Sequence, residues 1–195
     1  SGANNTVITN NGTINANAED SPVFSNGSTI INNGLIRTSG DNNTVTDFRG
    51  SGHNFTNNGT IITTGEGSEA FFNRADNDVF NNNGLIQTSG LNSDVFEWIG
   101  ENTIINNSGR IAAIGSATRA INGSNNADTL NLLSGSQIIG TIDLNAGTDI
   151  VNISGANNSS TLTLTDVETI NLLNGNALLV GDVATVVDPT GQSVS

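Results

Sequence analysis

Residues Ile31–Gly40 read INNGLIRTSG, and residues Phe80–Gly90 read FNNNGLIQTSG. Two near-copies of one decapeptide indicate an internal repeat. The repeat is marked by Asn-Asn-Gly triplets, with Asn-Ser-Gly as a fifth member, and these end at Gly12, Gly34, Gly59, Gly84 and Gly109. The last four glycines follow one another at a constant interval, and the first interval is slightly shorter. A fixed period of this length is typical of solenoid proteins.

Apolar residues recur at three positions in every repeat. Four residues before the glycine stand Ile8, Ile30, Phe55, Phe80 and Ile105. Two residues after it stand Ile14, Ile36, Ile61, Ile86 and Ile111. A third column, with a wobble of a residue or two, holds Phe24, Phe48, Phe71, Phe96 and Ile121. Three short apolar segments bounded by Gly, Asn, Ser or Asp predict three short strands per coil, and the absence of helical spacing predicts almost no helix.

Stacking explains why the columns are so regular. One coil cannot bury three apolar faces, but coils spaced about 4.8 Å apart can, because like residues then lie over like and parallel strands pair their backbone groups. Asn suits the corners because it tolerates the left-handed backbone and its amide can bond to the Asn above and below. The sequence therefore predicts an all-β fold, a right-handed parallel β-helix with three-strand coils of about 25 residues.

The pattern divides the chain into three parts. Residues 1–126 carry the regular coils with Asn-Asn-Gly corners. From Ala127 the Asn-Asn-Gly corners disappear, Leu replaces Ile and Phe, and apolar and polar residues alternate over longer runs. This alternation predicts longer strands in residues 127–188, which would cap the end of the solenoid. Residues 189–195 are expected to be a linker.

Composition excludes several classes of function. The chain of 195 residues has 18 acidic residues against five arginines, for a formal net charge of −13. Nucleic acid and anionic membranes need clustered positive charge, so both are poor partners. There is no Cys, which rules out disulfides and thiolate chemistry. No initiator Met or signal segment is seen, so a fragment or a processed product is expected.

Catalytic and metal-binding signals are weak. His53 is the only histidine, no Gly-x-Ser-x-Gly elbow is present, and one His without Cys argues against zinc. We therefore expect no enzyme activity, no catalytic residues, no cofactor and no metal. Asp128 and Asp149 lie in segments that partly resemble calcium-binding nonapeptide repeats, but they are more than two nonapeptides apart and lack the paired glycines. The run Thr161–Thr165 is too isolated to form a threonine array.

A candidate partner surface lies near the third strand of each coil. Acidic residues there occur at roughly matching phase and could form a stripe, which would be a catalytic pair, a cation site or a solvated face. Phe72 and Trp98 stand close to the inward column, where they would either form an exposed aromatic patch or fill a wide corner of the core. The predicted surface comprises Asp47, Glu69, Phe72, Arg74, Asp94, Glu97 and Trp98.

The repeated NNGTI and NNGLIRTSG coils resemble the β-helical passenger domains of bacterial autotransporters, the type V secreted surface proteins. The segments DTLNLLSGSQIIGTIDLNAGTDIVNISG (128–155) and LLVGDVATVVDPTG (178–191) are similar to the autochaperone-like cap at the end of such passengers. The resemblance implies export, an anchor through a C-terminal outer-membrane barrel that is not in this chain, and display on the cell surface or secretion.

Members of that family act as adhesins, self-association factors, proteases, esterases or toxins. Because the protease and esterase motifs are missing, we expect a non-enzymatic passenger that mediates adhesion to host cells or bacterial self-association. Its partner would be a host cell-surface protein or glycan, or another copy of itself. The alternatives are a released effector that binds a host receptor, a carbohydrate-active β-helix enzyme, and a structural stalk.

Overall fold

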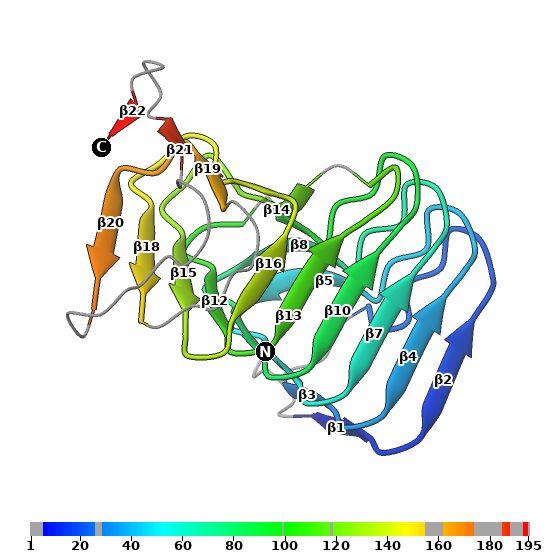
Figure 1. Ribbon diagram of the computed structural model, residues 1–195. Helices are drawn as coiled ribbons and strands as arrows, with labels where there is room; N and C mark the ends of the chain where they lie inside the picture. The colour runs from blue at the N-terminus through cyan, green and yellow to red at the C-terminus, as the bar shows by residue number, and fades with distance from the viewer. Residues whose placement is uncertain are drawn as a thin grey trace.

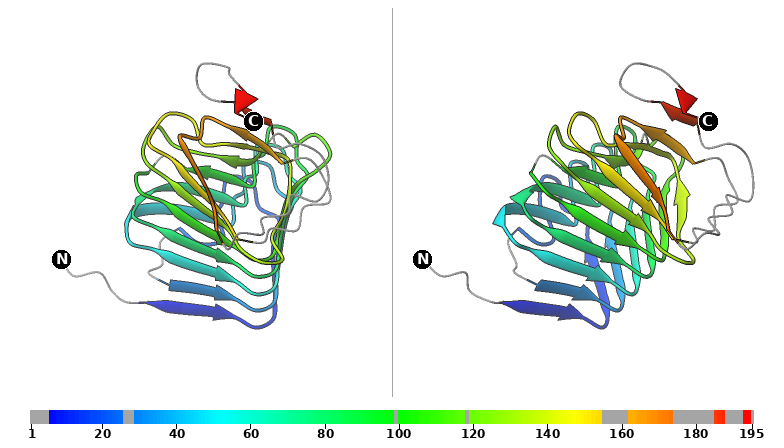
Figure 2. Two further views of the ribbon diagram at one scale, coloured as in Figure 1. Left: turned by 60° about the vertical axis from the view of Figure 1, so that its left-hand side comes forward. Right: turned by 90° about the vertical axis from the view of Figure 1, so that its left-hand side faces the viewer.

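The computed structural model describes residues 6–25, 29–98, 100–117, 119–154, 162–173, 185–187 and 193–194. These residues form β-strands, turns and bends, with no helix among them. Parallel sheets stack as a β-helix of about six turns (Figure 1). The predicted fold class is therefore confirmed. The first coil, with β1 and β2, lies at one end of the solenoid and the C-terminal strands lie at the other (Figure 2).

Three sheets run along the solenoid. The first contains β1 (Val7–Asn10), β3 (Thr29–Asn32), β6 (Asn54–Asn57), β9 (Val79–Asn82), β12 (Ile104–Asn107), β15 (Thr129–Leu132), β18 (Ile150–Ile153) and β20 (Thr169–Leu172). The second contains β2 (Thr13–Ala16), β4 (Leu35–Thr38), β7 (Thr60–Thr63), β10 (Leu85–Thr88), β13 (Arg110–Ala113) and β16 (Gln137–Ile139). The third contains β5 (Thr46–Ser51), β8 (Phe71–Asp76), β11 (Phe96–Trp98), β14 (Arg119–Asn122), β17 (Thr141–Asp143), β19 (Thr163–Thr165), β21 (Thr185–Val187) and β22 (Ser193–Val194).

The first two apolar columns lie in the register that the sequence predicts. In the first sheet Ile30 pairs with Phe55, and in the second Ile36 pairs with Ile61. Ile30, Ile36 and Ile61 have no exposed surface. Like side chains therefore stack on each other inside the solenoid, and their burial supplies the main driving force for folding.

The third column differs from the prediction at one place. Thr46, not Phe48, pairs with Phe71, so Phe48 lies two residues further along β5. Its ring is fully buried and stacks on the ring of Phe80, with centroids 6.1 Å apart. The six-residue strands β5 and β8 offer more than one inward position, so an aromatic ring two residues out of register still reaches the core.

The prediction of longer strands in the C-terminal part is wrong. The described strands from β15 to β20 have only three or four residues. The alternating run LNLLSGSQII spans one strand, an exposed corner at Leu133 and the following strand. The coils instead become shorter along the first sheet. Ile104 pairs with Thr129, Thr129 with Ile150 and Ile150 with Thr169, and each step along the sequence is shorter than the one before it.

Asparagine ladders hold the Asn-x-Gly corners, as the sequence predicts. The inner ladder is buried: Asn32 Nδ2 donates to Asn57 Oδ1 at 2.8 Å, and Asn57 Nδ2 donates to Asn82 Oδ1 at 2.9 Å. None of the inner asparagines has the left-handed backbone that we expected; that conformation occurs at other corners, for example at Asn42 and Asn77. The inner side chains instead cap their own turn, because Asn32 Oδ1 accepts from the backbone N–H of Gly34 at 3.3 Å.

Candidate functional site

The outward face of the third sheet carries one column of the predicted partner surface. Asp47 pairs with Phe72 and Phe72 with Glu97, so the three side chains follow each other from coil to coil. The Arg74 guanidinium lies 4.6 Å from the centroid of the Phe72 ring, an arrangement that a cation–π attraction stabilises. Asp47 Oδ2 accepts from the Arg49 guanidinium at 3.0 Å.

A shallow pocket of about 260 Å³ lies beside this column. It brings together four of the seven residues predicted for the partner surface, namely Asp47, Glu69, Phe72 and Arg74. Asp20, Pro22, Asn42, Thr44 and Gly67 complete its lining. The pocket therefore combines carboxylates, one aromatic ring and one guanidinium, a mixture that suits a polar partner with a cationic or apolar group.

The other acidic residues belong to a different column. Continuing the strand register by two residues aligns Glu69 with Asp94 and Asp94 with Arg119. Asp94 is only 5% exposed, so it does not contribute to the open face. The expected single stripe is thus two columns. Asp47, Phe72 and Glu97 follow one another in the outward column, whereas Glu69 and Asp94 belong to a second column in which Asp94 is buried.

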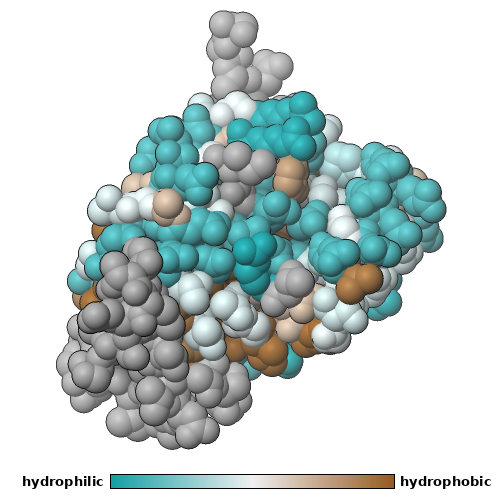
Figure 3. Space-filling model, turned by 90° about the horizontal axis from the view of Figure 1, so that it is seen from above, coloured by the Kyte–Doolittle hydropathy of each residue, from teal (hydrophilic) through white to brown (hydrophobic). Residues whose placement is uncertain are grey.

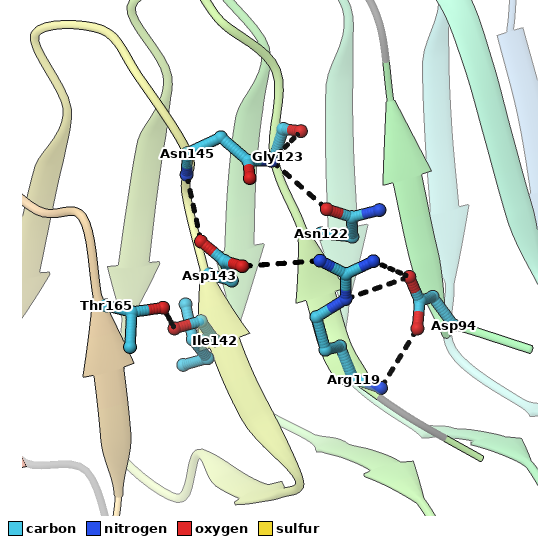
Figure 4. Close-up of polar contacts among 8 residues, drawn as sticks. All are labelled: Asp94, Arg119, Asn122, Gly123, Ile142, Asp143, Asn145 and Thr165. Carbon is cyan, nitrogen blue, oxygen red and sulfur yellow. Dashed lines mark hydrogen bonds and ion pairs between the residues drawn. The ribbon is translucent and has the colours of Figure 1, made fainter.

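Arg119 bridges the two columns (Figure 4). Asp143 belongs to the outward column, because Asn122 pairs with both Glu97 and Asp143. Its guanidinium lies 3.2 Å from Asp94 Oδ2 and 3.2 Å from Asp143 Oδ2, and its backbone N–H donates to Asp94 Oδ1 at 2.9 Å. Sequence reasoning missed Arg119 and Asp143 as part of this face. The available signal was the spacing, because Arg119 stands one full coil after Asp94, and opposite charges one coil apart are neighbours.

Burial changes the acidity of this face. Burial, with a smaller contribution from the nearby Glu97 and Asp94 charges, raises the pKa of Glu69 to about 7. Burial and the Asp94 charge also raise the pKa of Glu97. The Glu69 carboxyl is therefore partly protonated near neutral pH, and this part of the surface becomes less negative as the pH falls.

A second pocket, of about 380 Å³, adjoins the same column at Glu97. Its remaining lining is almost entirely amide and hydroxyl groups, from Asn122, Gly123, Ser124, Asn125, Asn126 and Asn145. Viewed from above, the molecule is dominated by hydrophilic side chains, with hydrophobic ones in small separate patches (Figure 3). The face seen in this view therefore favours polar recognition over burial of a large apolar ligand.

Trp98 and His53 were also singled out in the sequence, and both can be placed in the fold. The backbone of Trp98 pairs with Asn73, but its side chain lies outside the described part of the protein. His53 precedes β6, where its ring stacks on Phe48 with centroids 4.7 Å apart and Nε2 lies 3.1 Å from the Arg49 carbonyl oxygen. The histidine thus packs against the solenoid wall.

The two aspartates of the calcium alternative lie in adjacent coils of the first sheet. Asp128 and Asp149 are both buried, and the backbone N–H of Asp128 donates to Asp149 Oδ1 at 2.7 Å. Asp128 also accepts from the backbone N–H of Thr103 at 2.9 Å and from the Ser124 hydroxyl at 2.9 Å. These carboxylates serve as corner caps. Over the described residues, no group of three or more His, Cys, Asp or Glu side chains is placed to hold a metal ion.

No protein-family model, curated protein or solved structure matched the chain. The part of the chain that the structure describes contains no helix long and apolar enough to cross a membrane.

Proposed function

We propose that the chain is a non-enzymatic passenger of the autotransporter type, displayed on the bacterial surface or secreted, and that it mediates adhesion. Its partner is a host cell-surface protein or glycan, or another copy of the chain. The Asn-x-Gly coils, the lack of Cys and the distinct C-terminal coils support the passenger assignment. A cysteine-free chain suits passage through a membrane in an unfolded state.

The observation that carries the binding proposal is the outward column with its pocket. Phe72 and Arg74 lie two residues apart on β8, and both line the 260 Å³ pocket together with Asp47 and Glu69. Arginine and aromatic residues are enriched among the side chains that dominate binding energy at protein interfaces. The surrounding carboxylates then select the partner by charge.

A matched pair of variants tests this proposal. Phe72→Ala/Arg74→Ala removes the aromatic ring and the guanidinium from the third sheet. Leu35→Ala/Arg37→Ala removes an apolar side chain and a guanidinium at the same spacing from the outward face of β4, in the second sheet. Both pairs project outward, so both variants should keep the fold. We expect the first variant to lose binding to cultured host cells or to bacteria and the second to retain it.

The outcome separates the proposal from its alternatives. Equal binding by both variants would refute the assignment of this face. Retention of one purified host receptor by the isolated chain would favour a released effector. No binding to cells or to itself, with a correctly folded chain, would favour a structural stalk.

A second candidate, a carbohydrate-active enzyme, rests on the Glu69 and Glu97 carboxyls. Their charges influence each other, and the raised pKa of Glu69 suits a general acid that is still partly protonated near neutral pH. For this candidate, Glu69→Gln would abolish release of reducing ends from a polysaccharide. Absence of any such release by the wild-type chain over a panel of polysaccharides would exclude this candidate.

A further inference from the structure

The outward face of the first sheet is the uncharged side of a strongly acidic molecule. The described strands of this sheet contain no Asp, Glu, Lys or Arg, whereas the second sheet carries Arg37 and Arg110 and the third carries Asp47 and Glu97. We propose that this face binds an extended, uncharged glycan of the cellulose type, which lies along the solenoid axis across successive coils. The site is separate from the partner surface on the third sheet, and neither depends on the other.

A continuous asparagine ladder runs along the middle of this face. Asn106 Nδ2 donates to Asn81 Oδ1 at 2.9 Å, and Asn131 Nδ2 donates to Asn106 Oδ1 at 2.7 Å. Asn152 Nδ2 continues the ladder to Asn131 Oδ1 at 2.7 Å, and all these side chains are partly exposed. An amide carries two N–H donors and two acceptor lone pairs, and the ladder uses one of each. Each rung therefore offers one donor and one acceptor to a ligand, at a spacing of about 4.8 Å along the axis.

A column of aliphatic side chains runs beside the ladder. Ile104 lies between Val79 and Thr129 in the strand register, and Ile150 follows Thr129 in the next coil. Each stands two residues before its asparagine, so both columns face outward from the same strands. A hexose has hydroxyl groups around its edge and C–H groups on its face. The hydroxyls match the remaining amide groups, and the C–H face packs against the methyl groups.

The ladder and the aliphatic column together form an amide strip on β9, β12, β15 and β18. These strands pair in parallel without a register shift, so the strip repeats the same contacts at every coil. Such a surface suits a ligand that repeats its own groups along an extended chain. The strip carries no aromatic ring, so each sugar unit binds weakly and the affinity comes from the number of rungs engaged at once.

Charge argues against the other occupants. The chain has a formal net charge of −13, and the amide strip has no cation that would bind an anionic polymer. A second copy would bring the same charge of −13, and no ion pair across the strip would offset the repulsion between the copies. A cationic polymer would be attracted to the carboxylates of the third sheet instead. An uncharged ligand meets this face without electrostatic repulsion.

The test is a titration of the isotope-labelled full chain with cellohexaose. We expect saturable changes in amide NMR shifts in β9, β12, β15 and β18. Cellobiose should bind at least about tenfold more weakly, because it is too short to contact every rung of the strip. Maltohexaose has the same sugar units in a curved chain, and it should also bind at least about tenfold more weakly because it leaves the row of rungs.

A matched pair of variants locates the site. Asn131→Leu replaces one rung by a side chain of similar shape without polar groups, and it should weaken cellohexaose binding about tenfold, the effect of one or two lost hydrogen bonds. Gln87→Leu makes the same kind of change on the outward face of β10, in the second sheet, and should leave binding unchanged. Urea unfolding checks that both variants keep the fold, and Asn106→Leu supplies another rung variant if Asn131→Leu does not.

Several outcomes would overturn the proposal. The wild-type chain would give no saturable shifts, the shifts would map to the third sheet, maltohexaose would bind as tightly as cellohexaose, or the rung variant and Gln87→Leu would bind equally well. Concentration-dependent dimers that disappear in Asn131→Leu, without any binding of cellohexaose, would show that a second copy occupies this face instead.

Discussion

Replacing Asn57 with leucine tests whether buried amide ladders stabilise this β-helix. Asn57 is fully buried; its Oδ1 accepts from Asn32 Nδ2 at 2.8 Å, and its Nδ2 donates to Asn82 Oδ1 at 2.9 Å and to the Leu85 carbonyl at 3.1 Å. Leucine has a similar size and shape, so Asn57→Leu removes the hydrogen bonds with little change in packing volume.

The expected cost follows from the groups left behind. Asn32 Nδ2 and Asn82 Oδ1 would each lose their closest buried partner, at about 1–3 kcal/mol per group. Longer bonds remain, from Asn32 Nδ2 to the Gly34 carbonyl at 3.3 Å and from the backbone of Gly84 to Asn82 Oδ1 at 3.3 Å. We therefore expect a loss of about 2–4 kcal/mol in the free energy of unfolding. For a domain of this size that lowers the thermal midpoint by roughly 5–15 °C.

The next residue in the sequence supplies the control. Asn58 forms the same kind of ladder on the exposed side of the corner, donating to Asn33 Oδ1 at 2.8 Å and accepting from Asn83 Nδ2 at 2.9 Å. Water replaces these bonds, so Asn58→Leu should change stability by less than about 0.5 kcal/mol. Urea unfolding followed by far-ultraviolet circular dichroism measures both variants. Equal losses for the two would refute the argument that burial makes the inner ladder important.

Three other predictions follow from the structure. Burial, with the charges of Asp128 and Glu168, raises the pKa of Asp149 from 3.8 to about 7. Its contribution to stability is therefore fully present below pH 3.8 and is lost as the pH rises through 7. The wild type should lose more stability than Asp149→Asn between about pH 4 and pH 7, the window that the shift defines, in urea titrations at a series of pH values. Arg119→Met leaves the buried Asp94 carboxylate without this cation and should lower the free energy of unfolding by about 1–2 kcal/mol. The loss is modest because the arginine is partly exposed and water screens its charge. Adding Asp94→Asn should recover part of that loss, and no recovery would argue against the ion pair. Phe71→Ala removes a buried ring that contacts three other phenylalanines, and it should lower the free energy of unfolding by about 3–5 kcal/mol in the same urea assay. A loss below that of Asn57→Leu would contradict the view that the stacked rings are the main source of stability.

The residues of the proposed partner surface were only partly predictable. Neighbours across coils follow from the constant period of the repeat, so the alignment of Asp47, Phe72 and Glu97 could be predicted from spacing alone. The direction of a side chain just before a strand depends on the corner conformation, which no period encodes. For that reason Asp94 was expected on the open face, whereas it is buried against Arg119.

The sequence by itself determined the architecture, because a strict repeat with three apolar columns has one compact solution, in which identical coils stack and pair in parallel. It also determined the corner ladders, since an asparagine that recurs in every coil must lie over its own copy. Only the tertiary structure decided which inward position each aromatic ring occupies, as for Phe48, and how far the C-terminal strands extend. Those features depend on how side chains of different volume fill one shared core and on where the chain turns, and both are settled by contacts between coils rather than within a repeat.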